Sequence, residues 1–142
     1  MLLPNDRAGL RGSYVEAWRK RREGLPAEPL EVQVADVIEL HPEYQPLLEH
    51  GEAVLERDWM PGEGETNPFL HMGLHLALRE QVATDRPQGI AALHRALAGR
   101  YGLHEAEHRM ADCLAEALWH AQRNNSLPDE VSYMEALRRL GR

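Results

Sequence analysis

The chain has 142 residues, of which 43% are hydrophobic, and its 16 basic and 23 acidic side chains give a net charge of −7. This length suits one domain that can bury a core without disulfide or metal staples, and the acidic balance argues against nucleic acid as the main partner. The single cysteine, the start without signal-peptide features and the absence of a long apolar run predict a cytoplasmic protein that does not bind membranes.

The first predicted helix is delimited by capping residues. Ser13 and Glu16 have the spacing of a capping box, in which each side chain bonds to the other residue's backbone N–H. We therefore expect the helix to begin near Ser13 and to end at Gly24. Residues 1–12 are expected to be loosely ordered.

Two further helices are predicted before residue 60. Apolar residues after Pro29 follow helical spacing, although Leu30, Val32 and Val34 also alternate like a strand, and we favour the helix. Pro42 ends it, because the residue before a proline avoids the helical conformation. The apolar residues of the third predicted helix are Tyr44, Leu47, Leu48, Val54 and Leu55.

Glycine and proline also divide the second half of the chain. The glycine-rich and charged residues 60–66 predict a loop, and Asn67 followed by Pro68 predicts the start of a helix that continues to about Thr84. The other predicted helices run from near Pro87 to Gly99 or Gly102, from about Leu103 to Arg123, and from Pro128-Asp129-Glu130 to Arg138-Arg139. The prediction is all-α: residues 1–142 form a single domain, a small bundle of about six helices.

Two pairs of histidines have the spacing of one helical turn: His71 with His75, and His104 with His108. Residues four apart lie on the same face of a helix, so each pair can present two imidazoles side by side to a transition metal. His71 and His75 share an apolar stripe with Leu74, Leu78 and Val82, where an imidazole is costly unless it is hydrogen-bonded or bound to a metal.

The helix with the second pair also carries two glutamates that face different ways. At about 100° per residue, Glu107 falls near the middle of the apolar face, whereas Glu105 falls on the polar side beside Arg109. We therefore expect Glu107 to be buried with a partner and Glu105 to be exposed. The remaining expected members of this apolar face are Leu103, Met110, Leu114, Ala117, Leu118 and Ala121.

Residues 104–108, with the sequence His-Glu-Ala-Glu-His, match both the zinc-protease pattern H-E-x-x-H and its inverted form H-x-x-E-H. A zinc hydrolase would need Glu105 or Glu107 as general base beside a metal-bound water, together with a third ligand. A substrate-binding edge strand is missing from the predicted elements. A di-iron carboxylate centre is disfavoured because the chain lacks a second E-x-x-H motif.

The predicted metal site lies in the bundle core. Mixed imidazole and carboxylate ligands suit Zn, Fe, Mn or Ni, and the sequence does not choose among these metals. His41, in a turn, or His94, on a short helix, could complete the site, although capping or surface positions are the commoner roles for such residues. The predicted ligands are His71, His75, His104, Glu107 and His108.

The chain resembles a bacterial family known only as a domain of unknown function, number eighteen forty-one in that series. The resemblance covers most of the chain after residue 30 and implies a cytoplasmic bacterial protein without a named activity. It supports treating the five candidate ligands together but supplies no ligand roles. The segments that carry it are His41-Pro42-Glu43-Tyr44, Asn67 to His75, Arg79-Glu80-Gln81, Asp85 to Ile90, His104 to His108, Asp112-Cys113-Leu114, Trp119 to Arg123, and Pro128-Asp129-Glu130.

Three functions remain open on the sequence alone. The favoured one is a helical protein with a transition-metal site, which leaves open whether it is an enzyme of hydrolytic or redox type. The alternative is a non-catalytic interaction protein in which the histidines and Glu107 form a buried hydrogen-bond network. The third is a minimal zinc hydrolase. An acidic helical surface would also tolerate a homodimer, and no particular protein partner is indicated.

Overall fold

The computed structural model describes residues 7–51, 57 and 67–142, and in this part of the chain every regular element is helical. The described residues form seven α-helices and one short 3-10 helix, which confirms the predicted all-α class. The chain divides into two compact units, residues 1–73 and residues 74–142. The single domain expected over residues 1–142 stays a prediction.

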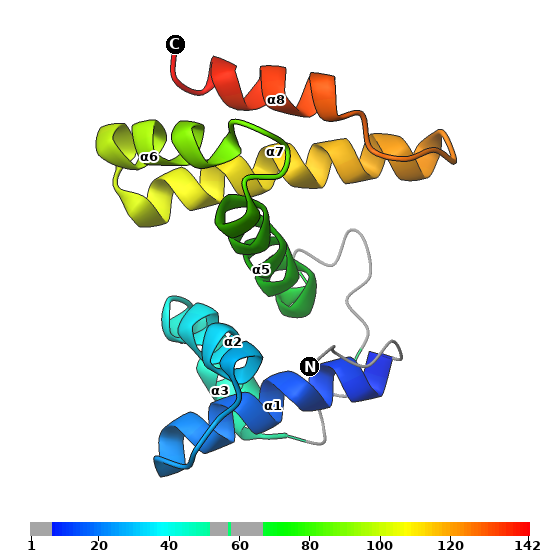
Figure 1. The fold of residues 1–142 in the computed structure, drawn as a ribbon. Helices are drawn as coiled ribbons and strands as arrows, with labels where there is room; N and C mark the ends of the chain where they lie inside the picture. Colours follow the sequence, from blue (N-terminus) through cyan, green and yellow to red (C-terminus); the bar gives the residue numbers. More distant parts are fainter. Residues whose placement is uncertain (1–6, 52–56, 58–66) are drawn as a thin grey trace. The chain divides into compact units, whose positions relative to one another are not determined.

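The first unit is built around α1 (Arg7–Glu23). Both α2 (Pro29–Glu39) and α3 (Gln45–Glu49) pack against α1, and η1 (Pro42–Tyr44) connects them (Figure 1). The start of α5 (Pro68–Thr84) also belongs to this unit. Its buried apolar side chains include Tyr14, Ala17, Trp18, Val34, Val37, Ile38, Leu48, Phe69 and Met72.

Helix α1 begins six residues before the predicted start, so the capping box at Ser13 was wrong. The Ser13 hydroxyl instead donates to the carbonyl oxygen of Gly9, four residues earlier, at 3.0 Å. A serine inside a helix can satisfy its hydroxyl in this way. The part of residues 1–12 from Arg7 onward is therefore helical, and residues 1–6 lie outside the described residues.

The third predicted helix was too long. Helix α3 ends at Glu49, and Gly51 then adopts a φ of 57°, a left-handed conformation that ends helices and that glycine adopts without steric cost. Val54 and Leu55, which were expected in this helix, lie outside the described residues, as does the predicted loop at 60–66.

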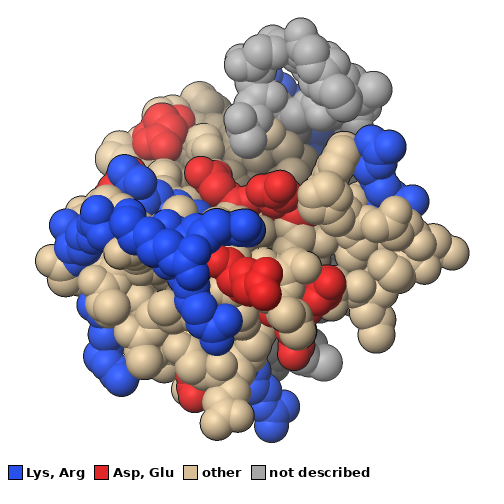
Figure 2. All heavy atoms as spheres, turned by 90° about the horizontal axis from the view of Figure 1, so that it is seen from above, with Lys and Arg blue, Asp and Glu red and all other residues tan. Residues whose placement is uncertain are grey.

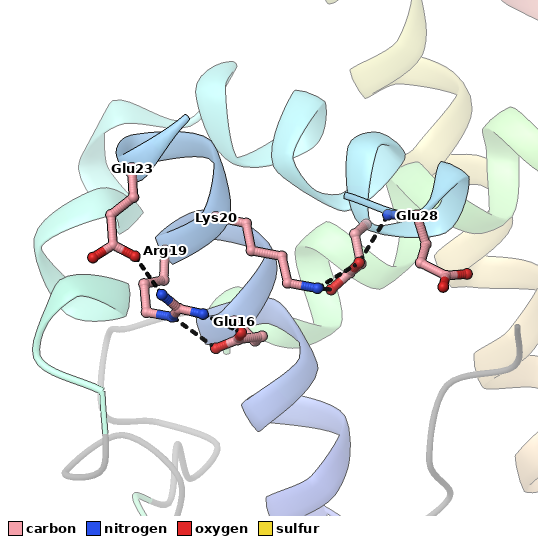
Figure 3. A network of polar contacts seen from close by, with 6 residues as sticks. Glu16, Arg19, Lys20, Glu23 and Glu28 are labelled. Carbon is pink, nitrogen blue, oxygen red and sulfur yellow. Dashed lines mark hydrogen bonds and ion pairs between the residues drawn. The ribbon is translucent and has the colours of Figure 1, made fainter. Parts of the chain in front are cut away.

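Charged side chains join α1 to itself and to α2 (Figure 3). Arg19 bonds to Glu16 and Glu23 on its own helix, while Lys20 donates to both oxygens of Glu31 on α2, at 2.9 and 2.8 Å. Glu31 also accepts a bond from the backbone N–H of Glu28, at 2.9 Å. The ion pair between Lys20 and Glu31 therefore fixes the start of α2 against α1.

The second unit contains the rest of α5, α6 (Ile90–Tyr101), α7 (Leu103–Arg123) and α8 (Glu130–Arg139). Helices α6 and α8 both pack on α7, and they also contact each other (Figure 1). Asp129 caps α8 by accepting bonds from the N–H groups of Val131 and Ser132. The core of this unit consists of Leu78, Ile90, Leu97, Ala106, Met110, Leu114, Tyr133, Met134 and Leu137.

The ends of α7 are less covered than predicted. Leu103 is 60% exposed and Leu118 is 41% exposed, although both were expected on the apolar face. Met110 and Leu114, near the middle of α7, are buried as expected. The helical wheel gives the direction of a side chain but not the length over which neighbouring helices cover it, which explains the difference.

The surface carries charges of both signs in small groups. On the face drawn in Figure 2, a band of basic side chains lies directly beside several acidic side chains. No described helix combines the length and the apolar character needed to span a bilayer.

Candidate metal centre

Helix α5 holds two of the predicted ligands on one face. The side chain of Asn67 accepts bonds from the N–H groups of Phe69 at 2.9 Å and Leu70 at 3.3 Å, which caps the helix as predicted. The helix then runs without interruption to Thr84 (Figure 1). His71 and His75 are consequently one turn apart on a single regular helix.

In the first unit, His71 meets a histidine that follows α2. His41 is 1% exposed, and its Nδ1 lies 2.8 Å from the carbonyl oxygen of Val37. Because a carbonyl only accepts, Nδ1 of His41 carries the proton and Nε2 has the lone pair. This Nε2 lies 3.2 Å from Nε2 of His71, so without a metal His71 donates this bond. The Tyr44 ring stacks on His41, with the ring centroids 5.3 Å apart.

In the second unit, His75 is fully buried and is held by a carboxylate. Its Nδ1 lies 2.7 Å from Oε1 of Glu107 on α7. Arg79, one turn further along α5, donates from Nε to the same oxygen at 2.9 Å. The Glu107 bond places the His75 proton on Nδ1, which leaves Nε2 of this ring with its lone pair.

The charge of Glu107 is maintained by these two partners. The side chain is 6% exposed, and burial alone would raise the pKa of a carboxyl group. The hydrogen bonds from His75 and Arg79 outweigh that effect, so the pKa of Glu107 lies below its usual value. Glu107 is therefore a buried anion with a cation beside it, as its position on the helical wheel predicted.

The other pair of histidines lies on α7 beside this cluster. The His108 ring is half-buried and packs on the His75 ring, with the centroids 4.7 Å apart. His104 is exposed, and the centroid of its ring lies 4.4 Å from that of His108. His75 and His108 thus bring one imidazole of α5 and one of α7 into contact.

Glu105 points away from these histidines. Its side chain is 55% exposed and accepts a bond from Arg109 at 3.0 Å. The predicted contrast between the two glutamates is thus confirmed. The exposed Glu105 is not placed to act as the general base of an H-E-x-x-H site, and Glu107 in the inverted form is already bonded to His75 and Arg79.

Of the five predicted ligands, His75, Glu107 and His108 lie together in the second unit, with His104 at their edge. His71 bonds to His41, which the sequence offered only as a residue that could complete a site. The signal that could have favoured His41 is the helix end at Pro42, which turns this histidine back toward α2. Each unit thus holds one pair of neighbouring imidazoles, His41 with His71 in the first and His75 with His108 in the second.

The comparisons with known proteins add a family to this description. The model of one family, described as Domain of unknown function (DUF1841), matches residues 6–139. The chain belongs to this family. No curated protein and no solved structure matches the chain. The description of the DUF1841 family names no activity.

Proposed function

We propose that this DUF1841 protein binds a transition metal through imidazole Nε2 atoms, and that the candidate ligands are the pair His41 and His71 of the first unit and the pair His75 and His108 of the second. The observation that carries the proposal is the orientation of the two buried rings, His41 and His75. Each has its Nδ1 proton bonded to a fixed acceptor, which directs the Nε2 lone pair away from that acceptor. Metal-binding histidines nearly always have an outer partner of this kind.

Helix geometry and one distance support the same ligand set. His71 and His75 lie one turn apart on α5, and each contacts one of the other two rings. In a tetrahedral site with bonds of about 2.05 Å, two ligand nitrogens are separated by about 3.3 Å. The Nε2 atoms of His41 and His71 are 3.2 Å apart, which fits that spacing once the proton between them is released.

Glu107, predicted as a ligand, acts here as an outer partner of His75. Oε1 of Glu107 is already bonded to Nδ1 of His75, and a carboxylate in that position orients the ring and makes it a stronger base toward the metal. An all-imidazole set suits Zn, Fe or Ni better than Mn, which prefers oxygen ligands. The exposed His104 is not needed as a ligand.

The experiment combines elemental analysis with melting curves in the presence and absence of a chelator. Metal at one hundred times its dissociation constant should stabilise the wild type by about 2.7 kcal/mol. The double variant His71→Ala/His108→Ala should purify without metal, and a chelator should not shift its melting curve. The control is His50→Ala/His120→Ala, because both of these histidines are exposed, and it should behave like the wild type.

Acidification provides a supporting measurement. Ligand imidazoles must be neutral, and protons compete with the metal for their nitrogens, so acidification should release the metal. Buried imidazoles without a metal also respond to acid, and the chelator therefore decides the question.

A structural hydrogen-bond network is the second candidate function. It is favoured by the fact that His41, His71 and His75 have hydrogen-bond partners without any metal. A purified wild type that contains no metal, together with a melting curve that a chelator does not move, would establish the network and contradict the metal proposal.

A further inference from the structure

A small pocket of about 300 Å³ lies in the second unit, between α5, α6 and α7. Leu78 and Val82 of α5 and Leu103 of α7 form its apolar wall. Arg79 and Glu107 form its polar wall, and Ala83 of α5 and His94 of α6 also line the pocket. The volume is at the small end of the range for ligand sites, so it suits a molecule of only a few heavy atoms.

The polar wall offers hydrogen bonds that no described residue uses. Both bonds to Glu107 end on Oε1, and Oε2 accepts none from the described residues. Arg79 uses Nε for Glu107, whereas its two terminal NH₂ groups donate to no described residue. The pocket therefore presents an acceptor and several donors close together, next to an apolar wall.

The charges of this wall select among polar groups. Arg79 and Glu107 form an ion pair at 2.9 Å, so the wall carries no net charge. A carboxylate in the pocket would meet the anionic Glu107, and an ammonium would meet the cationic Arg79. A carboxamide avoids both repulsions, because its oxygen accepts from Arg79 while its N–H donates to Oε2 of Glu107.

We infer that this pocket binds the carboxamide end of a small aliphatic molecule. The apolar wall takes the hydrocarbon part, and the paired Arg79 and Glu107 take the amide. Since Glu107 also orients His75, the inference deepens the proposed function by naming the chemical class of a ligand beside the metal, and in that respect it rests on the proposed function.

The test uses three probes with the same branched hydrocarbon end: isovaleramide, isovalerate and isopentylamine. Binding is followed by NMR on the full chain, through the methyl signals of Leu78, Val82 and Leu103. Isovaleramide should produce saturable shifts of these methyl groups, and the two charged probes should bind at least tenfold more weakly. Equal or tighter binding of isovalerate or isopentylamine, or no binding of isovaleramide, would overturn the inference.

Two tryptophan variants locate the binding site. Leu103 lines the pocket but is 60% exposed, so Leu103→Trp should fold and fill the pocket, and should abolish isovaleramide binding. The matched control is Leu127→Trp, at a residue that is 89% exposed and lies outside the pocket lining, and it should bind as the wild type does. Retained binding in Leu103→Trp would contradict the assigned pocket.

Both experiments are run on chelator-treated and metal-loaded protein, which separates this inference from the proposed metal site. Isovaleramide binding that survives chelation supports the pocket whatever the outcome of the metal analysis. A protein that binds metal but not isovaleramide would overturn the pocket and leave the metal proposal standing.

Discussion

Each of the two units contains a buried imidazole, and the two imidazoles have different hydrogen-bond acceptors. In the first unit, the backbone carbonyl of Val37 accepts the Nδ1 proton of His41. In the second unit, Oε1 of Glu107 accepts the Nδ1 proton of His75, and Arg79 stands beside it. Both arrangements fix the tautomer of the ring, but only the second places a charge in the core.

This difference has an energetic consequence. A backbone carbonyl is present at every position and orients an imidazole without a buried charge. A buried carboxylate must be compensated by hydrogen bonds and a cation. Removing the carboxylate leaves these partners buried without a bond, which lowers the free energy of unfolding. We therefore expect the polar cluster of the second unit to respond to substitution more strongly than that of the first.

The largest effect is expected for Glu107→Leu. This change leaves Nδ1 of the buried His75 without its acceptor and Arg79 without its partner, so the free energy of unfolding should fall by about 3 kcal/mol. Urea unfolding followed by circular dichroism measures it. The control, Glu105→Gln, removes an exposed carboxylate from the same helix and should change stability by less than about 0.5 kcal/mol. Equal effects of the two substitutions would show that Glu107 has no special role in the core.

A smaller effect should appear in alkaline solution, where the first unit responds through a buried phenol. Burial raises the pKa of Tyr14 to about 12, above the ordinary value of 10.0. A raised pKa means that this contribution to stability is complete below about pH 10 and is lost as the pH rises toward 12. At about pH 11 the loss should be of order 1 kcal/mol.

The variant Tyr14→Phe keeps the aromatic ring that packs on Phe69 and removes the titrating hydroxyl. The difference in unfolding free energy between about pH 8 and about pH 11 should be smaller in this variant than in the wild type. Tyr133→Phe tests the second unit in the same way, since burial also raises the pKa of Tyr133. An unchanged pH response in Tyr14→Phe would contradict the assignment to Tyr14.

The smallest effect is expected at the surface network of α1 (Figure 3). Arg19 and its partners Glu16 and Glu23 have side chains between 41% and 51% exposed, so water and salt screen their attraction. In Arg19→Met, the midpoint of urea unfolding should stay within the scatter of repeated curves at physiological salt. A clear destabilisation would show that exposed pairs matter in this protein as much as the buried pair of Glu107.

Capping and helix-breaking residues predicted much of the helical structure. Asn67 with Pro68 gave the start of α5, Gly102 separates α6 from α7, and Asp129 caps α8. These signals act within a few residues, so they can be recognised without the rest of the fold. Ser13 shows the limit of this reasoning, because the same residue types serve inside a helix when the hydroxyl bonds one turn back.

The helical period also predicted part of the site. It placed His71 and His75 on one face, and it separated the buried Glu107 from the exposed Glu105. These are properties of one regular helix at a time, which is why the spacing of the residues was sufficient. Of the predicted ligands, the proposed set keeps His71, His75 and His108, and His41 takes the place of His104 and Glu107.

Only the tertiary structure decided which side chains meet. The pairing of His41 with His71, and the Glu107 oxygen shared by His75 and Arg79, join segments about 30 residues apart in the chain. Contacts at such separations depend on how helices pack, and the period of a single helix does not contain that information. Sequence therefore determined the helices and the faces of their histidines, and packing determined that Glu107 holds an imidazole in place.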